Sequence, residues 1–166
     1  MKTLRIAAAL ICAAGGAVAG PLDGKSYIIE LTSSQFVSGS GQDLVPPLFE
    51  VLSQTEMVSV EGPEADIVIN IVPDRDDGRW VEEDEGAQVW LYTVSILIGI
   101  SPGGYRIPED GTPVFGVRAV LETPNPDRED ELACLIGLAA RAAVKSYQPE
   151  GLFEADGSGC LREASR

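Results

Sequence analysis

The chain has 166 residues, carries 12 basic against 26 acidic residues, and contains no histidine. The resulting formal charge of −14 repels phosphate backbones and anionic lipid headgroups, so nucleic-acid binding and membrane-surface binding are disfavoured. The absence of histidine excludes Ser-His-Asp and Cys-His catalysis within the chain, and it also excludes zinc sites with histidine ligands.

The first residues have the pattern of a secretory signal peptide. Lys2 and Arg5 precede an apolar run over residues 6–14, and small residues ending in Ala17-Val18-Ala19 follow. This order is typical of a cleaved signal with an A-x-A site, and the apolar run is too short for a permanent transmembrane helix. We therefore expect cleavage after Ala19, no stable membrane insertion afterwards, and a periplasmic or secreted protein. The alternative is a retained N-terminal anchor.

Cleavage would also change the charge and the number of cysteines. Losing residues 1–19 removes two basic residues and Cys12, which leaves 10 basic and 26 acidic residues, a formal charge of −16. Cys134 and Cys160 remain, and an even pair in an exported protein indicates a disulfide, worth ~3 kcal/mol for a loop of this length. A catalytic or metal-binding thiol pair is the weaker interpretation. We expect one domain over residues 20–160 and a frayed tail over 161–166.

The N-terminal half predicts strands on either side of a helix. Residues 25–32 and 65–72 alternate between apolar and mixed positions, which is typical of strands with one buried face. Between them, Asp43 is expected to cap a helix, and residues 57–60 are expected to form a short strand. Residues 74–87 are expected to form a polar, acidic loop. The helix would bury an apolar stripe made of Leu44, Val45, Leu48, Val51 and Leu52.

The next segment predicts a long hairpin. Every even position from 90 to 100 is a large apolar or aromatic residue, so that face of the strand over residues 88–100 should point into the core. Trp90 is therefore expected in the core, and Trp80 over a sheet edge. Residues 101–112 are rich in turn formers and should lead into a return strand over residues 114–122.

The last element is a helix that begins near Asn125-Pro126-Asp127 and reaches Tyr147. Acidic residues in its first turn and basic residues toward its end suit the helix dipole. A tail from Gln148 is long enough to run back along this helix and bring Cys160 to Cys134. Together these elements predict a two-layer α+β sandwich: a mainly antiparallel sheet of four or five strands, with two amphipathic helices on one face.

The acidic loop is the first candidate for binding chemistry. Its carboxylates could serve as calcium ligands, and the spacing is similar to that of an EF-hand loop. The match fails because Gly78 and Arg79 occupy the positions that need a ligand and a glycine, and because strands flank the loop. We favour a solvated loop and keep calcium binding as the alternative. The candidate ligands are Asp74, Asp76, Asp77 and Glu85.

The outward face of the sheet is the second candidate. Polar and charged residues on several predicted strands should share this face, where a carboxylate beside Arg118 could anchor a polar ligand. An ordinary solvated sheet face is the alternative that we favour, and an exposed apolar patch there would indicate a protein partner. The residues are Asp66, Asn70, Thr93, Ser95, Arg118 and Glu122.

These observations favour a small, exported binding or accessory module of the cell envelope that is not an enzyme, uses no cofactor and binds another envelope protein. This interpretation rests mainly on missing catalytic and cofactor motifs. A domain that binds a small ligand or a divalent cation such as calcium is the first alternative. A hydrolase that uses only carboxylates is the remote one.

Overall fold

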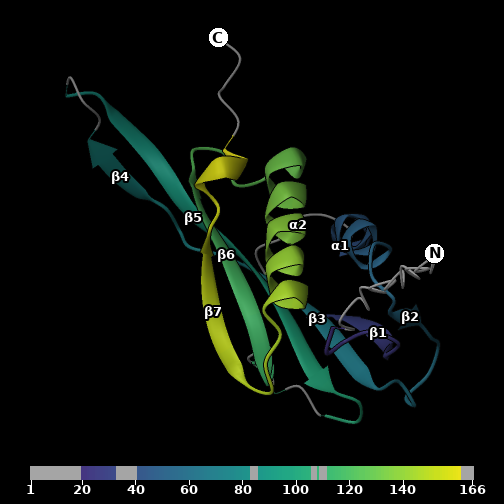
Figure 1. Cartoon of the computed structure of the whole chain (residues 1–166). Coiled ribbons are helices and arrows are strands. Elements are labelled where there is room, and N and C mark those ends of the chain that lie inside the picture. Colours follow the sequence, from purple (N-terminus) through teal and green to yellow (C-terminus); the bar gives the residue numbers. More distant parts are fainter. Residues whose placement is uncertain (1–19, 33–40, 83–85, 106–107, 109–111, 162–166) are drawn as a thin grey trace, which may run out of the picture.

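The computed structural model describes residues 20–32, 41–82, 86–105, 108 and 112–161 (Figure 1). The expected signal peptide, Glu85 and residues 162–166 of the expected tail lie outside these ranges. Within them, no helix has both the length and the apolar character that crossing a membrane requires.

The described strands form one mixed sheet of seven strands. Its order is β2-β1-β3-β5-β6-β7, and β4 lies off this path, paired with residues 88–91 of β5. The α+β class is confirmed. The predicted sheet of four or five mainly antiparallel strands is wrong in its number of strands and in its pairing, because the described sheet has seven strands and includes parallel pairs. The strands are β1 (Ser26–Leu31), β2 (Val58–Ser59), β3 (Ile67–Arg75), β4 (Arg79–Glu82), β5 (Gln88–Pro102), β6 (Phe115–Thr123) and β7 (Gly151–Asp156).

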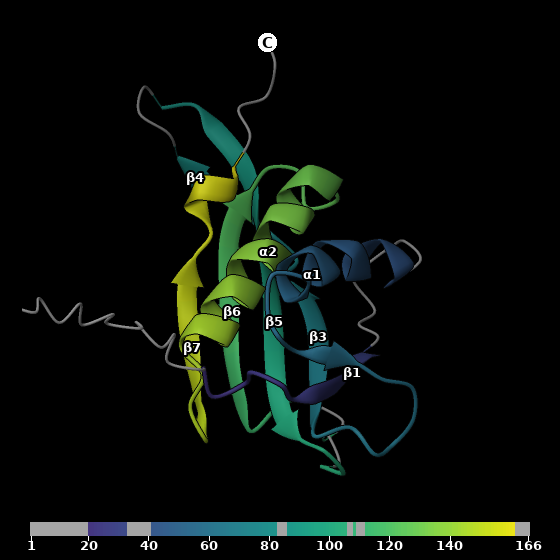
Figure 2. The ribbon, with the colours of Figure 1, turned by 45° about the vertical axis from the view of Figure 1, so that its right-hand side comes forward.

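Parallel pairs arise at both sides of the sheet because helices connect the strands there. The segment with α1 (Val45–Leu52) links β1 to its parallel neighbour β3, and α2 (Glu129–Lys145) links β6 to its parallel neighbour β7. Both helices lie on the same face of the sheet (Figures 1 and 2). A 3₁₀ turn, Gly41–Leu44, precedes α1, so Asp43 lies in that turn, and Leu44 is the N-cap residue.

The core lies between the two layers, and its register follows the alternation in the sequence. Ile69 is paired with Ile100, which is paired in turn with Phe115, and the next aligned positions on this face are also apolar. These side chains are fully buried, and α2 packs on β5 and β6. The prediction that the even positions of β5 face the core is therefore confirmed from Val94 to Ile100.

The C-terminal segment differs from its prediction. Residues 151–156 do run back beside α2, but as the strand β7 along β6. The 3₁₀ turn Ser158–Cys160 then carries Cys160 to Cys134 on α2, and a disulfide joins the two with their Cα atoms 5.6 Å apart. The disulfide therefore fastens the end of the last strand to the helix that precedes it.

Candidate functional site

A two-stranded ribbon projects from the body of the molecule. It consists of β4 and residues 88–91 of β5, and we call it the ribbon. The last residue of β6, Thr123, pairs with Tyr92, so β5 continues for four more residues with only β4 beside it among the described strands. Figure 1 shows the ribbon extending past the helices. Its side chains are therefore presented to solvent on both faces.

A β-bulge sets the geometry at the base of the ribbon. Three residues, 76–78, lie opposite two residues of β5, and the Asp76 carboxylate accepts hydrogen bonds from the backbone N–H groups of Gly78 and Thr93 at 2.9 and 2.8 Å. Gly78 has a φ of 80°, and a Cβ atom there would lie 2.2 Å from the indole nitrogen of Trp90. Only glycine combines this backbone conformation with room for the indole.

Three aromatic side chains follow one another on the helix-side face of the ribbon and of the residue at its base, and we call them the aromatic row: Trp80, Trp90 and Tyr92. The Trp80 and Trp90 rings meet edge to face with centroids 5.2 Å apart, and Trp90 meets Tyr92 in the same way at 6.4 Å. Such pairs stabilise a fixed arrangement of rings even where solvent reaches them. Trp80 is 63% exposed, which is unusual for a tryptophan on an ordered strand.

The expectation that Trp90 lies in the core is wrong. Trp90 is on the core-facing side of β5, but it is only half-buried because neither helix reaches the ribbon. Trp80 packs on Trp90 across the ribbon, so it does stand at the outer strand of this part of the sheet. The two tryptophans therefore form a surface cluster.

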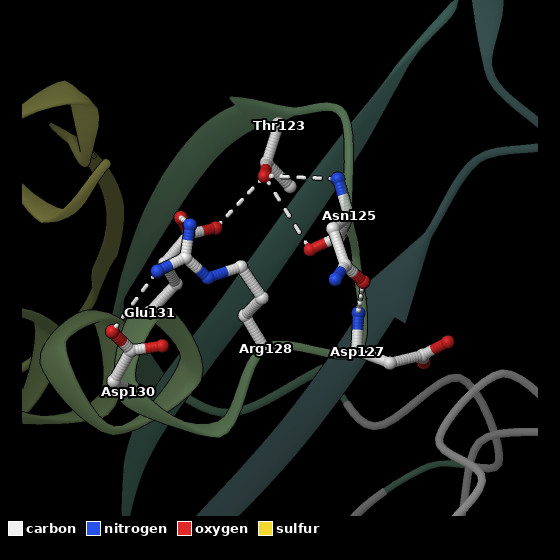
Figure 3. A network of polar contacts seen from close by, with 6 residues as sticks. All are labelled: Thr123, Asn125, Asp127, Arg128, Asp130 and Glu131. Atoms are coloured by element: carbon white, nitrogen blue, oxygen red, sulfur yellow. Dashed lines mark hydrogen bonds and ion pairs between the residues drawn. The ribbon is translucent and has the colours of Figure 1, made fainter. Parts of the chain in front are cut away.

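A polar network ties the start of α2 to the base of the ribbon (Figure 3). The carboxylate of Glu131, only 2% exposed, accepts a hydrogen bond from the Thr123 hydroxyl at 2.8 Å and pairs with Arg128 at 3.2 Å. Farther along, Asp127 pairs with Arg75 at 3.1 Å, and the Arg75 guanidinium lies 5.8 Å from the centre of the Tyr92 ring. The aromatic row is thus held at one end by the body of the domain.

The acidic loop does not assemble a cation site in the part that the structure describes. Asp76 is engaged in the bulge, where burial raises its pKa but the hydrogen bonds from Thr93 and Gly78 outweigh this and leave the pKa below its ordinary value. Asp74 accepts a hydrogen bond from the backbone N–H of Arg75. Asp77 is exposed, and Glu85 lies outside the described residues. Within the described ranges, no group of three or more acidic, cysteine or histidine side chains could hold a metal ion.

Five of the six residues expected on the outward sheet face lie at strand positions that share that face, and Asp66 directly precedes β3; together the six do not form one free surface. Asn70 and Ser95 are both buried. Asn70 is covered because Pro113 returns over the sheet beside Gly99 and Asn70. Asp66 accepts hydrogen bonds from the backbone and hydroxyl of Ser26, and these bonds lower its pKa despite some desolvation.

The remaining three outward residues lie at two places. Glu122 is cross-strand from Thr93 and forms an ion pair with Arg79 of the ribbon. Arg118 is exposed near β7, where it lies beside Glu154. The outward face is therefore divided into a covered centre and two exposed ends.

Comparison with known proteins gives no family. No protein-family model matches the chain, and no curated protein matches it. Among solved structures, a minor lipoprotein from Acinetobacter baumannii is similar at 14% identity and a TM-score of 0.43, over 76% of this chain and 98% of that one. A PDZ domain protein from Parabacteroides distasonis is similar at 11% identity and a TM-score of 0.42, over 76% of this chain; the chain spans 33% of that protein.

Proposed function

We propose that the protein is an exported, non-enzymatic interaction module that docks on another cell-envelope protein through the ribbon. The observation that carries the proposal is Trp80, which is 63% exposed on a projecting ribbon and packed against Trp90. Tryptophan, tyrosine and arginine dominate the energetics of protein interfaces, and the aromatic row with Arg75 supplies all three. The disulfide suits the oxidising compartments outside the cytoplasm.

The row is prepared for binding because little of its conformational freedom remains to be lost. Gly78 leaves room for the Trp90 indole, the edge-to-face contact with Trp90 orients Trp80, and the Arg75 guanidinium packs on the Tyr92 ring. A side chain that is already fixed before association costs less entropy when it is buried in an interface. Trp80 is thus the anchor side chain of the proposed interface.

Charge indicates the kind of partner. The ribbon ends in Glu82, the sequence continues with Glu83-Asp84-Glu85, and the whole chain has a formal charge of −14. A partner with an apolar pocket for Trp80 and a basic rim around it would complement this end of the ribbon. Electrostatic attraction of this kind speeds association and disfavours acidic competitors.

Photo-crosslinking in the native host tests the proposal. A tagged protein would carry a photoreactive phenylalanine analogue at position 80, and a second version would carry it at position 49 on α1. Phe49 is a matched control because it is also exposed, at 43%, and lies on α1, away from the ribbon. We expect one dominant adduct with an envelope protein from position 80 only. Equal adducts from both positions, or none from position 80, would remove the proposal.

A further inference from the structure

The last strand of the sheet offers a second surface, independent of the ribbon. No described strand pairs with the outer edge of β7. The backbone N–H group of Gly151 donates to the carbonyl of Val114, directly before β6, at 3.1 Å, and that of Gly157 donates to the carbonyl of Val120 in β6 at 2.7 Å. Along a strand of a parallel pair, the backbone N–H and C=O groups of successive residues point alternately toward the partner strand and away from it. The backbone groups of Leu152, Glu154 and Asp156 therefore point away from β6.

The side chains of β7 leave both faces of this edge open. Leu152, on the outward face, is 56% exposed, and Phe153, on the helix-side face, is 43% exposed. A shallow hollow of about 230 Å³ lies beside Leu152, and its lining includes Leu97, Arg118 and Glu154. An added strand would therefore find apolar contacts on each face in addition to free backbone groups.

The charges on β7 select the occupant. Glu154 and Asp156 lie on the outward face, so a second copy of β7 would bring four carboxylates to the same side of the sheet. Acidic side chains thus guard the edge against self-pairing, which is one way in which proteins protect exposed strands. The same side chains favour a strand with basic residues on its outward face and apolar residues toward Phe153.

We propose that β7 accepts an extended segment of another protein, with alternating basic and apolar residues, as an additional strand of the sheet. Its lysine or arginine side chains would lay their apolar stems over Leu152 and direct their charges to Glu154 and Asp156. Its alternate apolar side chains would cover Phe153. Strand addition of this kind gains affinity from backbone hydrogen bonds and specificity from alternate side chains.

Hydrogen exchange by NMR with the peptide Lys-Val-Lys-Val-Lys-Val tests this proposal on the disulfide-bonded protein. We expect the peptide to slow exchange at the N–H groups of Leu152, Glu154 and Asp156. The N–H groups of Phe153 and Ala155 point toward β6 and should be protected already. Exchange that is unchanged at the three outward groups, or changed only in the ribbon, would overturn the proposal. Protection that grows with protein concentration and needs no peptide would show a second copy instead, and would also overturn it.

Charge reversal gives the matched variants. Glu154→Lys should weaken binding of the basic peptide by about tenfold and improve binding of Glu-Val-Glu-Val-Glu-Val, whereas Glu64→Lys, at an exposed site outside β7, should change either affinity by less than about threefold. Equal effects of the two variants would mean that only the overall charge matters, against the proposal. Trp80→Ala should leave peptide binding unchanged, so this test can fail or succeed separately from the proposed ribbon interface.

Discussion

Replacing Thr123 by valine should destabilise the protein by about 2 kcal/mol, because valine keeps the shape of threonine but cannot donate to Glu131. The hydroxyl is 2.8 Å from the Glu131 carboxylate, and both residues are almost completely buried. Hydrogen bonds to a buried charged group contribute about 1.5–3 kcal/mol. For a domain of this size the loss corresponds to a decrease in Tm of ~6 °C. Urea unfolding with the disulfide intact would measure it.

A double-mutant cycle separates this hydrogen bond from other effects of the substitution. In a Glu131→Met background the carboxylate is gone, so Thr123→Val should cost at least about 1 kcal/mol less than in the parent protein. The part that remains would reflect the contacts between Thr123 and Asn125. Thr123→Ser keeps the hydroxyl and should lose less than valine does. The same cost for Thr123→Val in both backgrounds would refute the reasoning.

Three further predictions concern stability. Reduction of the Cys134–Cys160 disulfide, which closes a separation of 26 residues, should lower the free energy of unfolding by about 3 kcal/mol; an unchanged urea midpoint under reducing conditions would contradict this. Gly78→Ala forces a left-handed backbone on alanine and places its Cβ against Trp90, so we expect a loss of ~2 kcal/mol and a shift in the tryptophan fluorescence spectrum; Gly62→Ala, which also has positive φ but has open space around it, should leave the spectrum unchanged. Hydrogen bonds lower the pKa values of Asp66, Asp76 and Asp156 in the folded protein, although burial opposes this, most strongly at Asp76. The stability that these three carboxylates contribute should therefore be complete above the ordinary pKa of 3.8 and be lost as the pH falls through the lowered values. Unfolding at pH 5 and pH 3 would show this, and Asp156→Asn should reduce the difference.

The alternation of the central strands was a reliable guide because large apolar side chains recur on the core face of each strand. Apolar residues recur at every second position around Ile69 in β3 and around Ile98 in β5, and the predicted core face of both strands is confirmed. The same pattern carries no information on where the helix layer ends. It therefore placed Trp90 on the right face but wrongly in the core.

The two strands that were missed are short and lie at exposed edges. In β4, Trp80 and Val81 stand within an acidic run, so the segment resembles a loop. In β7, Leu152 and Phe153 are adjacent and point to opposite faces, which removes the alternation that marks a half-buried strand. The prediction that Asn70 lies on a solvated face was wrong for another reason, because Pro113, which is distant in sequence, covers it. Local patterns cannot reveal such long-range contacts.

The affinity of the captured envelope partner for Trp80→Ala and Phe49→Ala variants tests the central claim most directly. Both substitutions remove an exposed aromatic side chain, so both should leave the urea midpoint close to that of the parent protein. We predict that Trp80→Ala raises the Kd by about thirtyfold or more, as for an anchor side chain, and that Phe49→Ala changes it by less than about twofold. An unchanged Kd for Trp80→Ala would contradict the assignment of the ribbon as the docking element.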